Sequence, residues 1–416
     1  MSEIQCRRGL VFLGALAAVA AVAAVPVAAQ APQGGNNTVA KAAPLRTAWG
    51  DPDVQGIWDA RIRVPFQRAR GETREFLTDA EVAAKEEAAN QREANREALI
   101  DSGEYLAIGE RYFPVDPGIF RDGSGGVLRD VKVSRRTSAI IDPPSGRLPP
   151  WTRAQMKRWE AREEASRGRG ETDSWEDRAL EERCMTRLSP VSAPAVRSPM
   201  LSLGANTDGG SASRDADRNV GSPMRRIMQF PGYVAITTLE IGHAGEGSYR
   251  IIPLDGRPKL GPSIRQWLGD SRGHWEGDTL VIEISNINGN QNGGPISPAR
   301  TSTVYPGSGE TLRVIERYKR IDVDTLEYRV TVEDSETYFR PYTVLRELSR
   351  DDDYEMQPFH CHEGHRSIGG AMAQARADEQ SALEYGIESQ NERFERYELL
   401  KKEWAELWPE WRESTR

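Results

Sequence analysis

The residues that build most metal and redox sites are scarce in this sequence. Its 416 residues include five histidines and three cysteines. No P-loop, dinucleotide-binding fingerprint, HExxH helix, CxxC pair, CxxCH haem site or EF-hand loop occurs along the chain. The sequence therefore gives no expectation of the common nucleotide, haem, zinc or calcium modules, and any chemistry must come from a less familiar arrangement of side chains.

A concentrated basic surface is also missing. The chain has 63 acidic and 55 basic residues, a formal net charge of −8, and the two signs are interspersed. Proteins that bind nucleic acids carry a basic patch or stripe, so nucleic acid is not an expected partner. The hydrophobic fraction of 38% lies below the roughly 45–50% of ordinary globular chains, which predicts long polar loops.

Long apolar runs are absent except near the amino terminus. There, a basic pair, Arg7 and Arg8, precedes an alanine-rich apolar run over 9–25, which is short for a membrane span. Small residues around 27–31 fit a signal-peptidase site. We predict a signal peptide over 1–29 and a periplasmic or secreted protein without an integral membrane span. An uncleaved anchor and twin-arginine export both stay open as alternatives.

Cleavage of this segment removes Cys6 and leaves two cysteines, Cys184 and Cys361. In an oxidising compartment an isolated pair often forms a disulfide. A bridge that closes so long a loop would stabilise the fold by ~4–5 kcal/mol in the chain-entropy model. We keep open both a Cys184–Cys361 disulfide and two free thiols.

After the signal peptide, composition and residue pattern divide the chain into four parts. Residues 30–45 are rich in Gly, Asn and Ala and are expected to form a flexible lead-in. We expect an N-terminal arm and helices over 46–225, packed on a β-rich core over 226–369, and a helical segment over 370–416. Sequence capping boxes open two of the expected helices, at 79–100 and 153–166.

The β-rich part contains about eight short runs of Val, Ile, Thr and Tyr with turn signals between them. Several alternate strictly, and Leu326, Tyr328, Val330 and Val332 share one face. We predict a mainly β fold with flanking helices (α+β), built as an antiparallel β-barrel or sandwich. The G-x-W triplet at 56–58 modestly favours a calycin-like or lipocalin-like barrel, which would hold a small-molecule pocket inside.

Four motifs occur together in this chain. They are DPPSGRLPP at 142–150, RIIPLDGRP at 250–258, QWLGDSRGHWEGDTLV at 266–281 and CHEG at 361–364. In combination they resemble a large family of exported bacterial proteins, most of which have no assigned activity. The resemblance covers roughly residues 45–385. It implies that the protein is exported and that these residues belong to one unit. It implies no particular reaction.

The segment 360–365 holds three of the five histidines and supports three interpretations. On a strand, His360 and His362 would point the same way, about 6–7 Å apart, and with His365 they would suit Zn, Fe or Cu. In the second interpretation, His362 exchanges protons near neutral pH with help from Glu363 and His243. The third is a hydrogen-bonded structural histidine. His360 and His365 depart from the family's usual pattern, so no cofactor is favoured.

Other polar residues of the motifs are candidates for substrate binding. Trp267 could stack on a ring, while Asp270 and Arg272 could line a pocket mouth, and Arg250 begins the RIIPLDGRP motif. The residues around 275–280 fit a tight hairpin with a Glu-Gly-Asp turn. A structural network of ion pairs is the competing explanation for these charges.

These patterns lead to one preferred function and two alternatives. We predict an exported enzyme that acts on a small organic molecule, cyclic or aromatic, by His/carboxylate acid–base chemistry of the hydrolase, lyase or isomerase type. The first alternative is a lipocalin-like small-molecule binding protein without turnover. The second is a metal-dependent enzyme with its ligands in 360–365.

Overall fold

The computed structural model describes the chain from residue 45 onward, with gaps. The described residues are 45–59, 62–101, 131–169, 173, 224–239, 248–288, 310–353, 373, 376–377 and 379–414. All of them belong to the compact unit Pro44–Arg416. None of the described helices is both long enough and apolar enough to cross a membrane.

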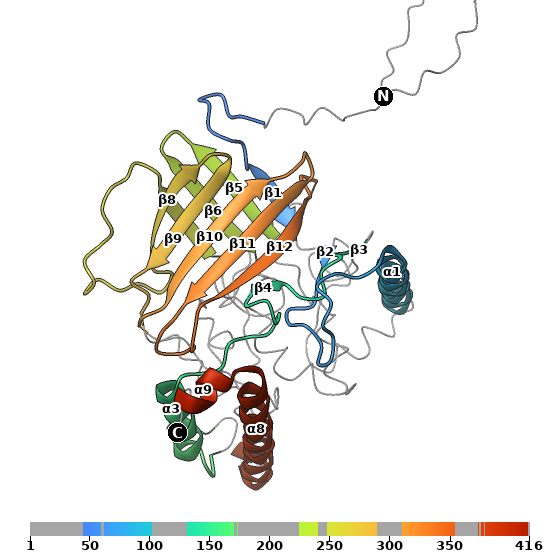
Figure 1. The fold of residues 1–416 in the computed structure, drawn as a ribbon, viewed down its shortest axis with the longest axis vertical. Coiled ribbons are helices and arrows are strands. Elements are labelled where there is room, and N and C mark those ends of the chain that lie inside the picture. Colours follow the sequence, from blue (N-terminus) through green and yellow to red (C-terminus); the bar gives the residue numbers. More distant parts are fainter. Residues whose placement is uncertain are drawn as a thin grey trace, which may run out of the picture. The chain divides into compact units, whose positions relative to one another are not determined.

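A ten-stranded antiparallel sheet forms the centre of this unit (Figure 1). The strands that build its main path are β1 (Gly56–Asp59), β5 (Met224–Phe230), β6 (Tyr233–Leu239), β7 (Ser248–Pro253), β8 (Asp270–Glu276), β9 (Thr279–Ser285), β10 (Arg313–Arg320), β11 (Thr325–Glu333) and β12 (Tyr342–Arg350). They lie in the order β7-β6-β5-β1-β12-β11-β10-β9-β8. Strands β5 to β7 and strands β8 to β12 therefore each form an up-and-down meander, and β1 joins the two between β5 and β12.

The two edge strands of this path, β7 and β8, approach each other closely. A Cβ atom added to Gly273 on β8 would lie 2.6 Å from the Leu254 side chain and 2.9 Å from that of Ile252 on β7. Only glycine permits this approach, and it lets the sheet curl into a nearly closed barrel. The predicted fold class, a mainly antiparallel β-barrel with flanking helices, is confirmed.

Two short additions complete the β structure. Strand β4 (Ile140–Asp142) pairs with β12, where Ile140 lies opposite Val344. Strands β2 (Ile62–Arg63) and β3 (Lys132–Val133) form a separate parallel pair. The barrel also takes β1 from the segment predicted as an N-terminal arm, because β1 pairs with both β5 and β12.

Strict alternation along the strands separates the interior of the barrel from its outer face. The residues Leu326, Tyr328, Val330 and Val332 of β11 are all buried, as their pattern predicts. Arg329 between them is exposed and pairs with Glu327 on the outer face. This period of two decides which charged residues of the other strands enter the barrel.

The helices in the described ranges are α1 (Asp79–Asp101), α3 (Arg153–Ala165), α8 (Glu379–Leu407) and α9 (Pro409–Ser414). The capping box of α1 is present: the Thr78 backbone N–H donates to the Glu81 carboxylate at 2.8 Å, and the Glu81 N–H donates to the Thr78 hydroxyl at 3.3 Å. Thr152 caps α3 by accepting the Gln155 N–H, while its own backbone N–H donates to the Thr337 carbonyl, so only one half of the second capping box forms. Both predicted helices are confirmed.

Aromatic side chains join α3, α8 and α9 to the barrel. Trp151 lies 5.3 Å from Trp404 and 5.9 Å from Tyr397 between ring centroids. The Trp411 indole N–H donates to the Trp151 carbonyl, and Trp151 pairs as an isolated bridge with Tyr338, which follows β11. This buried aromatic cluster fixes the helices next to the turn between β11 and β12.

Candidate functional site

All of the predicted catalytic and metal-binding residues lie outside the described residues. These are His243, His360, His362, Glu363 and His365, together with Cys184 and Cys361 of the expected disulfide. Their roles stay predictions. Within the described ranges, no group of three or more His, Cys, Asp or Glu residues could hold a metal ion.

Arg250 is the predicted site residue that enters the barrel. It lies on β7, is buried, and donates from Nη1 to Oε2 of Glu316 at 2.7 Å. Glu316 belongs to β10 and has no exposed surface. Strands β8 and β9 lie between β7 and β10 around the barrel, so the Arg250–Glu316 ion pair crosses the barrel interior.

Arg250 is part of a larger buried group that we call the arginine cluster. Its members are the six interior side chains Arg225, Arg250, Arg346, Glu316, Tyr318 and Tyr328. Arg225 of β5 donates to the Tyr318 hydroxyl at 2.6 Å, across three intervening strands. The Tyr318 and Tyr328 hydroxyls lie 3.1 and 2.7 Å from Oε1 of Glu316. One carboxylate thus receives hydrogen bonds from two tyrosines and one arginine.

The rings of the two tyrosines hold the cluster together. They stack with centroids 4.7 Å apart, and the Arg225 guanidinium carbon lies 4.3 Å from the centre of the Tyr328 ring. A guanidinium over an aromatic face is attracted by the ring quadrupole, more strongly where water is excluded. Arg225 is therefore fixed by a ring, a hydroxyl and the Glu316 charge at 3.8 Å.

Burial and charge set the protonation of these groups. Burial opposes ionisation of Glu316, but the charges of Arg250 and Arg225 outweigh it and lower the pKa of Glu316 below its ordinary value. Burial raises the pKa of Tyr318 to about 12 and the pKa of Tyr328 well above its ordinary value. At neutral pH, Glu316 is an anion and both tyrosines remain hydrogen-bond donors.

Arg346 differs from the other two arginines. It lies on β12 opposite Tyr328, with 4% of its surface exposed. Within the described part of the chain it makes no hydrogen bond or ion pair, and its buried Nε has no partner. Burial, with help from the Arg225 charge, lowers the pKa of Arg346 to about 10. The side chain remains a cation at neutral pH, so it is a buried charge that no anion among the described residues compensates.

The arginine cluster is therefore unbalanced in charge and in hydrogen bonds. The cluster holds three guanidinium groups and one carboxylate, which pairs with Arg225 and Arg250, and the buried Nε atoms of all three arginines lack an acceptor among the described residues. Buried charges in proteins are normally paired, because removing an ion from water costs several kcal/mol. This arrangement has the capacity to bind an anionic group from outside the chain.

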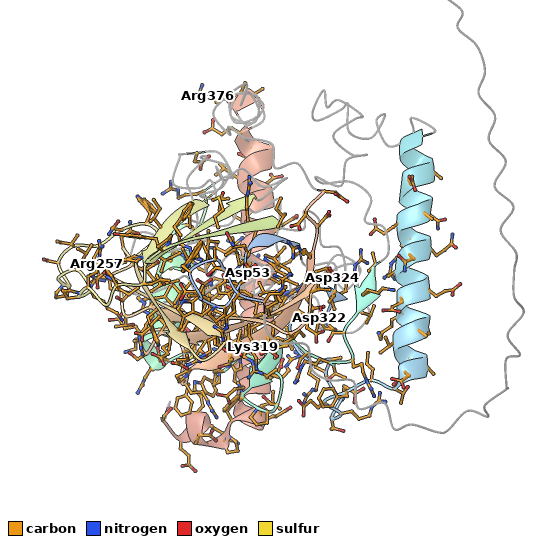
Figure 2. The ribbon with its side chains drawn as sticks, turned by 90° about the horizontal axis from the view of Figure 1, so that it is seen from above. Asp53, Arg257, Lys319, Asp322, Asp324 and Arg376 are labelled. Carbon is orange, nitrogen blue, oxygen red and sulfur yellow. The ribbon has the colours of Figure 1, made fainter. Side chains whose placement is uncertain are left out.

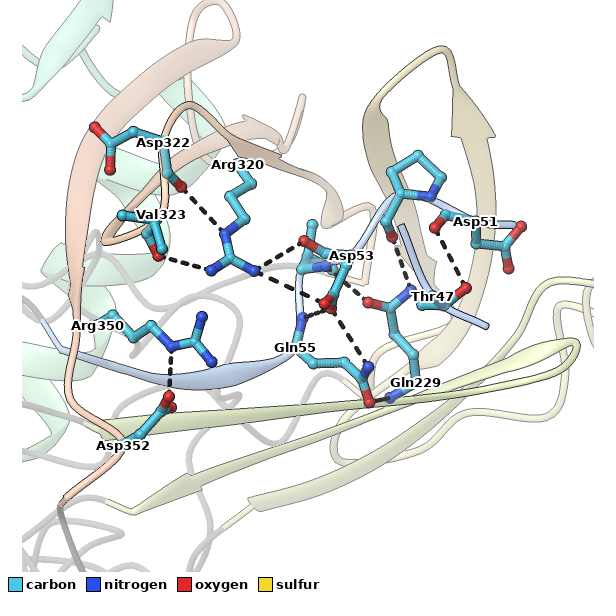
Figure 3. Close-up of polar contacts among 12 residues, drawn as sticks. Thr47, Asp51, Asp53, Gln55, Gln229, Arg320, Asp322, Val323, Arg350 and Asp352 are labelled. Carbon is cyan, nitrogen blue, oxygen red and sulfur yellow. Dashed lines mark hydrogen bonds and ion pairs between the residues drawn. The ribbon is translucent and has the colours of Figure 1, made fainter. Parts of the chain in front are cut away.

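A second polar network includes Asp53, Arg320 and Arg350 (Figure 3), and its two arginines lie over the ring of Trp58, on β1. The guanidinium carbons of Arg320 and Arg350 lie 5.5 and 6.0 Å from the centre of its ring. Arg320 donates to the carbonyls of Asp53 and Val323, and other side chains here are paired within the chain. The charged groups of this network pair with one another, so we interpret the network as structural support for the start of β1.

Three of the predicted substrate-binding residues lie at or next to the start of β8. Asp270 is buried and accepts the Leu260 N–H at 2.8 Å, and it also pairs with Arg272. Arg272 donates to the Pro258 carbonyl. Both side chains thus hold the connection between β7 and β8, while Trp267 is half-buried just before β8. Their role in substrate binding stays a prediction.

The same connection carries Arg257 at its outer side. Figure 2 shows this residue at the periphery of the molecule. It is exposed and bonds to Asp255 and the Tyr233 hydroxyl. Exposed pairs of this kind contribute little to stability, so they shape the connection without forming a site.

Replacing Asp270 with asparagine should loosen this connection. The change keeps the size of the side chain but removes the buried charge opposite Arg272, and we expect a loss of about 1–3 kcal/mol in the free energy of unfolding. Urea denaturation measures it. Asp255→Asn, at an exposed pair on the same connection, is the matched control and should change stability much less. Equal effects from the two variants would contradict the structural role of Asp270.

Five members of the arginine cluster were not predicted as site residues, although the sequence contains a pattern that marks them. On β10, Val314, Glu316 and Tyr318 share the buried face. A charge that falls in phase with buried residues of an alternating strand must enter the core. Arg346, between Val344 and Leu348 on β12, follows the same rule.

Comparisons with known proteins add little to this picture. No family model matches the chain, and no curated protein matches it. Among solved structures, the chain is similar to a secretary abundant heat soluble (SAHS) protein from Ramazzottius varieornatus. That match has 11% identity and a TM-score of 0.21, and it covers 37% of this chain and 83% of the other. At that score the likeness carries no argument about function.

Proposed function

We propose that this protein binds a small organic molecule inside its barrel, in contact with the arginine cluster. The observation that carries the proposal is the uncompensated positive charge in the interior, where Arg346 is buried without a partner among the described residues. Antiparallel barrels built from about eight strands have interiors that accommodate either packed side chains or one small ligand.

Stability alone gives no reason for such a cluster. Well-packed apolar residues in place of a buried ionic group are often neutral or stabilising. The neighbouring interior positions follow that rule, since Val330 and Val344 are fully buried and apolar. A charged cluster surrounded by apolar side chains is typical of binding sites, which use a few placed polar groups in an otherwise apolar lining.

Hydrogen–deuterium exchange with a panel of acidic, neutral and basic organic compounds tests this proposal. We expect at least one compound to bind with one-to-one stoichiometry in native mass spectrometry. It should slow amide exchange in peptides that cover 313–333 and 342–350. Helix α1, which packs against β3, is the internal control and should be unchanged. Binding by no compound, or protection confined to segments outside the barrel, would overturn the proposal.

We further propose that His362, assisted by Glu363 and His243, acts on the bound molecule by acid–base chemistry. What supports this is Arg250: this predicted substrate-binding residue lies in the barrel interior, on the strand that begins five residues after His243. The reaction would be a hydrolysis, elimination or isomerisation, and it needs no nucleotide cofactor.

Replacing His362 with alanine separates an enzyme from a binding protein. We expect His362→Ala to abolish turnover of a bound compound and to leave its affinity within about threefold. His365→Ala is the matched control, because His365 departs from the family's pattern, and it should keep turnover. Steady-state assays and calorimetry provide the two readouts. Full turnover by His362→Ala would leave a binding function without this chemistry.

A further inference from the structure

We infer that the molecule bound at the arginine cluster carries a carboxylate, and that Arg346 is the side chain that binds it. This inference rests on the proposed function. It names the chemical class of the ligand and the residue that selects it, and both follow from how the three buried arginines differ in their partners.

Arg225 and Arg250 are already occupied by the protein. Arg250 makes a 2.7 Å ion pair with Glu316. Arg225 donates to Tyr318 and stacks over Tyr328. Glu316 in turn accepts from both tyrosines, so its oxygens are committed. Arg346 is the guanidinium that these acceptors leave without a partner in the described part of the barrel.

The chemistry of Arg346 selects its ligand. A guanidinium presents a planar fork of donors that matches the two oxygens of a carboxylate, and such bidentate pairs are among the strongest hydrogen-bonded contacts in proteins. Because the side chain is buried, an incoming anion would meet a donor for which little water competes. A neutral ligand would leave the charge unpaired.

The surroundings of Arg346 favour an organic acid. Along β12, the interior neighbours are Val344 and Leu348, and Val330 lies beside Val344 on β11. An apolar body attached to one carboxylate matches one unpaired guanidinium among apolar side chains. Inorganic phosphate offers similar oxygens but no apolar part, and it is the competing anion in the test.

Calorimetric titration with matched probes tests this inference. The probes are benzoate and hexanoate, their neutral counterparts benzamide and hexanamide, and inorganic phosphate. We expect at least one carboxylate to bind the wild-type protein, and its amide to bind at least about 30-fold more weakly, as for the loss of a buried charge pair. Arg346→Met should weaken the carboxylate by a similar factor and leave the amide unchanged.

Two further variants complete the design. Arg346→Lys keeps the charge and loses the fork, so an intermediate affinity is expected; it also covers the case in which Arg346→Met fails to fold. Arg329→Met removes an arginine from the outer face of the neighbouring strand, and it should bind the carboxylate like the wild type.

The possible failures are distinguishable. Equal binding of acid and amide, or unchanged carboxylate affinity in both Arg346 variants, would overturn the inference and leave the proposed binding function standing. Tighter binding of phosphate than of either acid would overturn the assignment of a carboxylate. Binding of none of the probes, together with a failed exchange experiment on the wider panel, would overturn both proposals.

Discussion

Replacing Glu316 with glutamine is expected to destabilise the protein by about 3–5 kcal/mol, the usual result of removing one partner from a buried ion pair. Glu316 is fully buried, and it compensates Arg250 at 2.7 Å and Arg225 at 3.8 Å. Glutamine keeps the shape and one acceptor oxygen but loses the charge. Two buried guanidinium groups would then face no anion.

Urea denaturation followed by circular dichroism measures this change. Glu276→Gln is the matched control, because Glu276 also pairs with an arginine, Arg317, but is exposed on the outer face. Its effect should be much smaller, because exposed ion pairs contribute little to stability. A Glu316→Gln variant as stable as the control would show that the cluster does not depend on this carboxylate.

The effect of Glu316→Gln on the free energy of unfolding should depend on pH. The pKa of Glu316 is lower in the folded protein than its ordinary value of 4.5, so the unfolded chain binds this proton more readily. The stability that Glu316 contributes is therefore fully present above about pH 4.5 and is lost as the pH falls through the folded pKa. We expect the difference in unfolding free energy between wild type and Glu316→Gln to shrink on acidification. A constant difference would contradict this linkage.

Replacing Arg346 with methionine is expected to have the opposite effect and to stabilise the ligand-free protein by about 1–4 kcal/mol. Arg346 is buried and unpaired among the described residues, so its removal ends the cost of holding an ion away from water. Methionine is apolar, unbranched and flexible, and it fills irregular space in cores. The extra stability should come together with the loss of carboxylate binding.

Thermal and urea unfolding of protein refolded without ligand measure this effect, and Arg329→Met is the matched control because it removes the same charge from the outer face. A loss of more than about 2 kcal/mol in Arg346→Met would show that Arg346 is a structural residue. A gain in stability with a loss of binding is the pattern of functional residues that proteins keep at a cost to the fold.

Local sequence patterns predicted much of the architecture. Alternation over residues 325–334 gave the buried face of β11, and the capping boxes at Thr78 and Thr152 gave the starts of α1 and α3. These features depend on neighbours in the chain. The G-x-W triplet at 56–58 favoured a barrel, but the place of β1 between β5 and β12 depends on pairing with distant segments, which this local pattern does not specify.

The candidate site was harder to predict than the fold. Histidines drew attention to 360–365, which lies outside the described residues, as do Cys184 and Cys361. The described residues test neither the disulfide nor the export signal nor the family resemblance, so all three stay predictions. The arginine cluster is assembled from five strands, and its members meet only when the sheet curls. The feature that the local sequence shows is a charged residue at a position where the strand pattern predicts burial, as at Glu316 and Arg346.

A crystal structure with a bound probe tests the binding site most directly. The protein would be crystallised with whichever of benzoate and hexanoate binds more tightly. We predict density for one molecule inside the barrel, with its carboxylate oxygens about 2.7–2.9 Å from the Arg346 guanidinium nitrogens and its apolar part against Val344. Density for the probe outside the barrel, or Arg346 paired with a carboxylate of the protein itself, would contradict a ligand site at the arginine cluster.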